Sequence, residues 1–368
     1  MEDMFRFADE LGPAKIVHIH EPTVGLKAIV VIDNVACGPS IGGVRMAPDV
    51  SVEECVRLAR AMTLKNAAAA LPHGGGKSVI FGDHRMPVAD KERIIRAFAC
   101  AIRDLHDYIS GPDMGTDERC MAWVRDEIGR AVGLPPVLGG IPLDEIGATG
   151  FGLVAAIEAA LPHCGLTLKG ARVAVQGFGA VGRHAARFLG EKGAILVAAA
   201  DTTATLSNPA GLDVNELSRH KLAGHALADF PTGEKSDPNA IVGVACDIWI
   251  PAARPDVLRA DNVARVQARL IAQGANIPAT DEAETMLHAR GILSLPDFIA
   301  NAGGVICAAV EYHGGTEATA FAAIAEKIGR NTHEVLEQAT RTRTTPRAAA
   351  LDLAGRRVRQ AMSYRRWG

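Results

Sequence analysis

The stretch ARVAVQGFGAVG, residues 171–182, decides the fold of the region around it. Its first half is short, apolar and β-branched, as expected of a buried strand, and it runs directly into a G-x-G-x-x-G motif. In that context the glycines allow a tight turn, a close approach of the backbone to a pyrophosphate, and close packing of a helix on a strand. The N–H groups at the start of that helix then face the phosphates. We therefore predict a dinucleotide site formed by Gly177, Phe178, Gly179, Ala180, Val181 and Gly182.

An acid follows this motif at the place where dinucleotide sites use one. Asp201 ends the next apolar run, residues 194–200. An acid there accepts hydrogen bonds from the ribose 2′-OH and repels a 2′-phosphate, which favours NAD over NADP. Thr202 and Thr203 do not exclude a phosphate, so NADP remains an alternative. A glycine-rich packing turn without a ligand is the alternative for the whole motif.

The rest of the chain predicts an α/β protein with two domains, as its length of 368 residues also suggests. Strands and helices alternate after the Gly- and Pro-rich segment 133–150, which indicates a parallel sheet with crossover helices. We predict an N-terminal α/β substrate-binding and oligomerisation domain over residues 1–145 and a Rossmann dinucleotide-binding domain over residues 146–324. Helices at about residues 325–368 are expected to return to the first domain, with a cleft between the two domains.

Composition excludes several classes of protein. Lys and Arg total 39, Asp and Glu total 42, and the net charge of −3 gives no basis for binding nucleic acid through bulk charge. No apolar run approaches the ~18 residues of a membrane helix, and no signal-peptide pattern opens the chain. The seven cysteines show no C-x-x-C spacing, so we expect neither disulfides nor a metal site, and a reducing, cytoplasmic location. His18 and His20 alternate on a predicted strand without further ligands.

A second glycine-rich stretch carries a lysine whose surroundings favour chemistry. The segment Gly74-Gly75-Gly76-Lys77-Ser78 lacks the spacing of a phosphate-binding P-loop. We interpret it as a turn in which the glycines admit a substrate and Lys77 is desolvated. Desolvation and a neighbouring cation both lower the pKa of a lysine, and Lys65, in an apolar helical stretch, is the expected cation. A solvated surface lysine is the alternative.

Asp113 is the carboxylate that could act beside Lys77. It lies in the Gly- and Pro-flanked segment Gly111-Pro112-Asp113-Met114-Gly115. An aspartate in such a segment commonly caps a turn. The functional alternative is a general acid/base, because a neutral lysine and a carboxylate together can activate water and transfer protons. The sequence alone does not bring the two side chains together.

These segments together resemble the glutamate/leucine/phenylalanine/valine dehydrogenase family. The resemblance spans almost the whole chain, in order, and rests on the blocks MTLKNAAAALPHGGGKSVIFGD, SGPDMGTDE, VQGFGAVG, QGAN and PDFIANAGGV. It implies a homo-oligomer that catalyses the reversible, NAD-dependent oxidative deamination of an L-amino acid. The products would be a 2-oxo acid and ammonia.

The resemblance also implies roles for residues at matching positions. Lys77 would activate the water that attacks the imino acid, and Asp113 would pass protons to and from the substrate nitrogen. Lys65 would pair with the substrate α-carboxylate. Further matches line the substrate pocket or contact the nicotinamide end of the cofactor: Gly43, Thr149, Asn276 and Asn301.

Two positions decide the expected substrate. In glutamate-specific members a cation precedes the GG-x-R segment and a hydroxyl follows NAGG, and here these positions are Ile41 and Ala308. A carboxylate buried against two apolar side chains would be unpaired, which is unfavourable. We therefore predict a branched-chain or aromatic L-amino acid and a pocket closest to that of leucine dehydrogenase. The alternatives are a glutamate dehydrogenase that binds the distal carboxylate elsewhere, for example through His73, and a non-catalytic paralogue that binds amino acid or NAD.

Overall fold

The computed structural model describes residues 5–366, which divide into two compact units. The first unit comprises the chain up to Pro142, Val305–Ala320 and the chain from Asp352 onward. The second unit comprises Leu143–Gly304 and Phe321–Leu351. Within residues 5–366, no helix has the length and apolar character needed to cross a bilayer.

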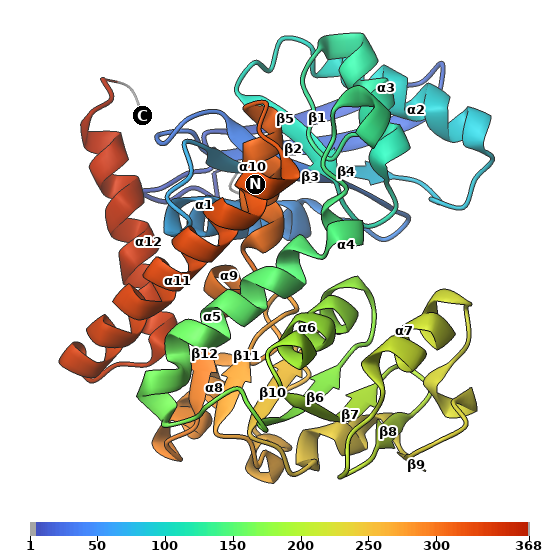
Figure 1. The fold of residues 1–368 in the computed structure, drawn as a ribbon. Coiled ribbons are helices and arrows are strands. Elements are labelled where there is room, and N and C mark those ends of the chain that lie inside the picture. The colour runs from blue at the N-terminus through green and yellow to red at the C-terminus, as the bar shows by residue number, and fades with distance from the viewer. Residues whose placement is uncertain (1–4, 367–368) are drawn as a thin grey trace. The chain divides into compact units, whose positions relative to one another are not determined.

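In the described part of the first unit, the strands form one five-stranded sheet in the order β1-β2-β4-β3-β5 (Figure 1). The strand β2 is antiparallel to both β1 and β4, and β3 is parallel to both β4 and β5. The strand bounds are Lys15–Glu21 (β1), Leu26–Asn34 (β2), Ser40–Ala47 (β3), Gly74–Phe81 (β4) and Tyr108–Pro112 (β5). The helices that follow β3, β4 and β5 are α1 (Val52–Ala68), α2 (Val88–Ala101) and α3 (Glu118–Ile128).

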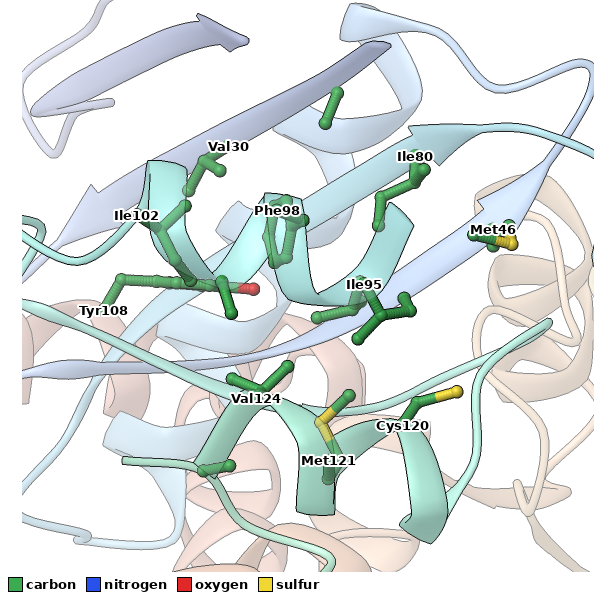
Figure 2. Packing of buried hydrophobic residues seen from close by; sticks show 14 of the residues in the cluster. Val30, Met46, Ile80, Ile95, Phe98, Ile102, Tyr108, Cys120, Met121 and Val124 are labelled. Carbon is green, nitrogen blue, oxygen red and sulfur yellow. The ribbon is translucent and has the colours of Figure 1, made fainter. Parts of the chain in front are cut away.

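Helices cover both faces of this sheet. On one face, Cys55 and Ala59 of α1 pack against Val31 and Val79. On the other face, α2 and α3 bury a second cluster in which Phe98 packs near the central strands (Figure 2). Because successive strand residues point to opposite faces, Lys77 shares the α1 face with Val79, two residues further along β4.

Residues 74–77 begin β4 and do not form the turn that we predicted. The glycines serve close packing. A Cβ atom at Gly74 would lie 1.8 Å from the carbonyl oxygen of Asn34, and one at Gly75 would lie 2.0 Å from the backbone nitrogen of Thr63. The end of β2 and the helix α1 can therefore approach this strand, and Lys77 is held on a rigid element and not on a loop.

In the described part of the second unit, a seven-stranded sheet has the order β12-β11-β10-β6-β7-β8-β9. The strands from β12 to β7 are parallel, and β8 and β9 add an antiparallel edge. This arrangement confirms the predicted fold class, an α/β protein with a Rossmann-like parallel sheet in its second unit. The strand bounds are Arg172–Gln176 (β6), Ile195–Ala200 (β7), Thr205–Ser207 (β8), Glu234–Ser236 (β9), Ile248–Pro251 (β10), Leu270–Ala272 (β11) and Leu293–Leu295 (β12).

Helices of the second unit precede, connect and follow these strands. They are α4 (Leu143–Ile146), α5 (Ala148–Cys164), α6 (Ala180–Glu191), α7 (Val214–Leu222), α8 (Asp281–Ala289) and α9 (Asp297–Ala300). Before β10, the residues Pro238–Gly243 form a 3₁₀ helix. Asp237 caps that helix by accepting a hydrogen bond from the Asn239 N–H at 2.8 Å.

The last helices, α10 (Gly303–Tyr312), α11 (Glu317–Thr342) and α12 (Pro346–Ser363), divide differently from our prediction. Of residues 325–368, which we predicted to return to the first domain, the chain from Asp352 onward groups with the first unit. Val305–Ala320, which we predicted in the second domain, also groups with the first unit. Side chains on α11 explain the difference. Phe321 packs edge-to-face on Phe151 of α5 at 4.7 Å, and the Ile328 Cδ1 lies 2.7 Å from the place of a Cβ on Gly152.

A buried arginine ties the start of α12 to the second unit. The Arg347 guanidinium donates hydrogen bonds to Gln273, Glu284 and Asp297, each at 2.9 Å. Its side chain is 15% exposed, and those of Glu284 and Asp297 are 4% and 6% exposed. Burial raises the pKa of Glu284, and the Arg347 charge works against that rise. The two carboxylates therefore depend on Arg347 for their charge balance.

Replacement of Arg347 by Met should lower the free energy of unfolding by about 3–5 kcal/mol, because it leaves two buried carboxylates without their cation. Urea denaturation monitored by circular dichroism measures this change. Arg330→Met is the matched control, since Arg330 pairs with Glu326 at the surface of α11 and both are about half exposed. The control should change the free energy by less than ~0.5 kcal/mol. Equal effects of the two variants would contradict the role of Arg347 as the cation that balances the two buried carboxylates.

Candidate active site

Lys77 and Asp113, far apart in the sequence, meet in the structure. Lys77 lies on β4 and Asp113 directly follows β5, with β3 between these strands. The Lys77 Nζ and the Asp113 Oδ2 are 3.0 Å apart. They meet over Gly43 of β3, where a Cβ atom would lie 2.8 Å from the Asp113 Cβ and 3.2 Å from the Lys77 Nζ. Gly43 therefore provides the space in which the pair forms.

Burial makes the Lys77 amine easier to deprotonate. The side chain is only 6% exposed, and the loss of hydration lowers the pKa of Lys77 although Asp113 acts to raise it. The Arg45 guanidinium adds to the lowering of this pKa. The sequence did not lead us to Arg45 as a neighbouring cation, and the contribution of Lys65 stays a prediction. The sequence signal for Arg45 was its place in the GG-x-R segment beside Gly43.

Arg45 also holds Asp113 in its charged form. The Arg45 Nε donates to the Asp113 Oδ2 at 2.7 Å, and its Nη1 donates to Glu54. Burial acts to raise the pKa of Asp113, but the ion pairs with Lys77 and Arg45 outweigh it and hold that pKa below its usual range. Thr116 fixes the turn, since its hydroxyl accepts a hydrogen bond from the Asp113 N–H at 3.0 Å. The site thus combines an ionised carboxylate with a lysine of lowered pKa.

Lys65 lies in the last turn of α1 and is 9% exposed. Its neighbour Asn66 donates from Nδ2 to the Gly74 carbonyl at 2.7 Å, which holds this end of α1 on the start of β4. The structure therefore places Lys65 on the helix that packs against the Lys77 strand. Its contact with a substrate carboxylate stays a prediction.

An apolar cluster lies on the same face of the sheet as the Lys77–Asp113 pair. Ile41 and Gly43 are two residues apart on β3, so they point to one face. Ile41 pairs with Ile109 of β5, and these two residues form a buried cluster with Val132 and with Ala308 of α10. Ile41 and Ala308 therefore meet in space, although they are far apart in the sequence. Sequence reasoning missed Ile109 and Val132. The register of β3 with β5 places Ile109, and the hydrogen bond from the Val132 N–H to the Ser110 carbonyl places Val132.

His73 has partners at both ring nitrogens. Its Nδ1 lies 3.1 Å from the carbonyl oxygen of Pro39, and its Nε2 lies 3.0 Å from the Nε2 of His313. Burial lowers the pKa of His73, which favours the neutral ring. His73 is therefore poorly suited to supply the charge for a distal substrate carboxylate.

The glycine motif of the second unit has the geometry of a phosphate site. Gly177 has a φ of +88°, and a Cβ there would lie 2.7 Å from the carbonyl oxygen of Ala252. Gly182 packs against the turn, with its Cβ position 2.0 Å from the Gly177 carbonyl oxygen. Gly179 is the N-cap of α6, has no side-chain cap, and has open space at its Cβ position. The first N–H groups of α6 are thus accessible to an anion, which fits a dinucleotide pyrophosphate.

Asp201 directly follows β7 and lies beside this turn, because the Gly177 N–H donates to the Ala200 carbonyl at 2.8 Å. Its carboxylate accepts hydrogen bonds from the Lys221 Nζ at 2.6 Å and from the N–H and hydroxyl of Thr203 at 2.8 and 2.5 Å. Burial acts to raise the pKa of Asp201, but Lys221 and Thr203 outweigh it and hold that pKa well below its usual range. The carboxylate is therefore ionised, and a ribose hydroxyl would share it with these donors.

Asn276 and Asn301 lie together. The Asn301 Nδ2 donates to the Asn276 Oδ1 at 3.1 Å and to the Gly274 carbonyl at 3.3 Å. Among the described residues, the buried Asn301 Oδ1 has no hydrogen-bond partner, so it can accept one from a ligand. The Thr149 hydroxyl lies 3.1 Å from the Cβ position of Gly304, near the start of α10. The residues present therefore fit a dinucleotide cofactor.

A metal centre has no comparable support. Within residues 5–366, no group of three or more His, Cys, Asp or Glu side chains is placed to hold a metal ion.

Comparisons with known proteins cover nearly the whole chain. Residues 139–366 match the family model "Glutamate/Leucine/Phenylalanine/Valine dehydrogenase", and residues 13–130 match "Glu/Leu/Phe/Val dehydrogenase, dimerisation domain". A glutamate dehydrogenase from Aeropyrum pernix is 35% identical in an alignment 357 residues long, which covers 91% of this chain and 85% of that protein.

Solved structures of similar proteins include enzymes named for different substrates. A hetero-hexameric glutamate dehydrogenase from Thermus thermophilus in a Leu-bound form has a TM-score of 0.84 and 30% identity, covering 95% of this chain and 89% of that one. L-Tryptophan dehydrogenase from Nostoc punctiforme has a TM-score of 0.75 and 28% identity, covering 96% and 98%. Glutamate dehydrogenase from Peptoniphilus asaccharolyticus has a TM-score of 0.83 and 28% identity, covering 97% and 92%.

Substitution of Asp113 by Asn should lower the pKa of Lys77 further, because it removes the negative charge that favours the ammonium form. The neutral amine would then form at a lower pH than in the unmodified protein. Reductive methylation of Lys77, followed by mass spectrometry across a pH series, measures the midpoint pH at which the amine becomes neutral. This measurement does not depend on activity. Asp83→Asn, at an exposed position after β4, is the control and should leave the midpoint unchanged. A midpoint that stays constant or rises in Asp113→Asn would contradict the pairing.

Proposed function

Because the chain belongs to the Glu/Leu/Phe/Val dehydrogenase family, which acts on the CH–NH₂ group of amino acids, we propose that its substrate is an apolar L-amino acid. The family is the one predicted from the motifs. The proposed reaction is the reversible oxidative deamination of a branched-chain or aromatic amino acid to a 2-oxo acid and ammonia, with NAD as hydride acceptor. The observation that carries this proposal is the apolar cluster on the same sheet face as the Lys77–Asp113 pair.

The apolar cluster argues against a charged substrate side chain. A distal carboxylate placed against Ile41, Ile109, Val132 and Ala308 would lose its hydration without gaining a partner from these side chains. His73 does not compensate, since both its ring nitrogens have partners and its lowered pKa favours the neutral form. An aliphatic or aromatic side chain would instead gain from burial.

In the proposed mechanism, the two charged side chains act on the substrate nitrogen and on water. The bound nicotinamide supplies the hydride acceptor. Lys77, whose lowered pKa makes the neutral amine accessible, takes a proton from the water that attacks the imine carbon. Asp113, ionised beside Arg45, accepts a proton from the substrate nitrogen and returns it to the leaving ammonia. Lys65 would bind the α-carboxylate and so orient the Cα–H bond.

The choice of NAD rests on Asp201. Its ionised carboxylate at the end of β7 would accept hydrogen bonds from ribose hydroxyls and disfavour a 2′-phosphate. Lys221, paired with Asp201 at 2.6 Å, offsets part of that negative charge. We therefore keep NADP as the second cofactor to be measured beside NAD.

Glutamate is the second candidate substrate, and a specific observation favours it. The Aeropyrum pernix relative with 35% identity is a glutamate dehydrogenase. The substrate measurement below therefore includes glutamate on equal terms with the apolar amino acids.

We further propose a homo-oligomer in a reducing, cytoplasmic compartment. A match to a dimerisation domain over residues 13–130 supports self-association, and the hetero-hexameric Thermus thermophilus relative supports an oligomeric assembly. The compartment is supported by the cysteines, since all seven lie within the described residues as free thiols.

The purified protein should reduce NAD with leucine, valine, isoleucine, phenylalanine or tryptophan, and much less with glutamate. Absorbance of NADH at alkaline pH measures turnover, with NADP run beside NAD. Lys77→Ala should lower kcat by about 10²–10⁴-fold, because it removes the group that activates water. Lys27→Ala, an exposed lysine on β2, is the control and should keep full activity. Turnover of glutamate alone would make glutamate dehydrogenase the function, and silence with every amino acid would favour a non-catalytic protein.

The double substitution Ile41→Lys with Ala308→Ser should shift the substrate towards glutamate. It places a cation and a hydroxyl where the apolar cluster now lies, so a distal carboxylate gains partners. The ratio of kcat/KM for glutamate to that for leucine should rise at least about tenfold. Ala308→Ser alone is the control, because the hydroxyl without the cation should change this ratio much less. An unchanged ratio in the double variant would show that these positions do not contact the substrate side chain.

A further inference from the structure

The pair of His73 and His313 lies outside the groups used by the proposed chemistry. His73 immediately precedes β4 and is fully buried, and His313 directly follows α10 and is exposed. Their Nε2 atoms are 3.0 Å apart, and the ring of Tyr312 packs against His73 edge-on at 5.7 Å. All these residues belong to the first unit.

The contacts fix which nitrogen carries each proton. The Pro39 carbonyl can only accept, so the His73 Nδ1 donates to it and the neutral His73 ring presents an unprotonated Nε2. The His313 Nε2 must then carry the proton and donate to the His73 Nε2. The result is a directional hydrogen bond from the end of α10 to the residue before β4.

This bond is placed to control the apolar cluster. Ala308 precedes Tyr312 by one helical turn on α10, and Pro39 precedes Ile41 by two residues. His73 therefore joins the segment that carries Ile41 to the helix that carries Ala308.

A second contact holds the same helix end from the other side. The Glu311 carboxylate accepts hydrogen bonds from the Leu134 N–H at 3.1 Å and from the Ile141 N–H at 2.8 Å. This contact fixes the segment that follows Val132, a further member of the apolar cluster. Of the two contacts, the one at His313 directs α10 towards β3 and β4.

We propose that His73 and His313 are positioning residues for substrate selection, which hold Ala308 of α10 against Ile41 and so set the size of the side-chain site. The inference rests on the proposed function, because it takes Ile41 and Ala308 as contacts of the substrate side chain. The hydrogen bonds of His73 and His313 do not include Lys77 or Asp113. Loss of the histidine pair should therefore change which substrates bind well but not the rate of the chemical step.

Two substitutions at His73 separate this role from simple packing. Asn reaches the position of the imidazole Nδ1 and keeps the contact with Pro39 but loses His313, whereas Gln reaches the position of Nε2 and can still accept from His313. His73→Asn and His313→Ala should each raise KM for leucine and phenylalanine roughly three- to tenfold, with kcat within about twofold. His73→Gln should restore most of the wild-type KM. The double variant His73→Asn with His313→Ala should be no worse than either single variant.

Kinetics with leucine, phenylalanine and glutamate, together with urea unfolding of each variant, decide the outcome. A KM effect that His73→Gln rescues supports the proposal. Equal losses with Asn and Gln, additive losses in the double variant, or a fall in kcat alone would overturn it. Wild-type protein without activity on apolar amino acids would instead overturn the proposed function. In that case, non-additive effects of His73→Asn and His313→Ala on the free energy of unfolding would still support the hydrogen bond as a structural contact.

Discussion

A buried ammonium group is the constraint on which the first unit depends. The Lys77 side chain is nearly removed from water, and a buried charge is tolerated only when it is paired. Its partner Asp113 comes from a strand that is not adjacent to β4, so the two side chains must meet over β3. That meeting requires Gly43, and it requires Arg45 to keep the carboxylate charged. The glycine at position 43 is thus a consequence of this ion pair.

The two units use glycine for different physical reasons. In the first unit, Gly43 and Gly75 lie in strands, where a missing side chain lets a neighbouring residue or helix approach. In the second unit, Gly177 adopts a positive φ in a turn, and Gly179 leaves the start of α6 open to an anion. Sequence spacing identifies the second use directly, because a turn, its helix and its strand are contiguous in the chain. The first use depends on strands that are distant in the sequence.

This difference explains what could be predicted from the sequence. The Rossmann sheet, its glycine turn and the place of Asp201 follow from local patterns. The strand at residues 74–77 was mistaken for a turn, because three successive glycines carry no strand preference of their own and are ordered by contacts with α1 and β2. Arg45 was not predicted beside Lys77 for the same reason, since only the strand order β4-β3-β5 brings it there. The grouping of residues 321–351 likewise depends on aromatic and aliphatic contacts with α5.

In the proposed function, the residues that carry out the chemistry and the residues that select the substrate share strands but are different residues. On β3, Gly43 serves the ion pair and Ile41 serves the apolar cluster, two residues apart on one rigid face. Ala308 is the member of the apolar cluster that comes from a helix. It is placed by contacts at the C-terminal end of α10 and not by the ion pair. If the proposed function holds, a change at Ile41 or Ala308 alters the accepted side chain while the lysine and carboxylate keep their geometry. Solved structures with a similar fold are named for glutamate and for tryptophan, so this fold is compatible with more than one kind of amino-acid side chain.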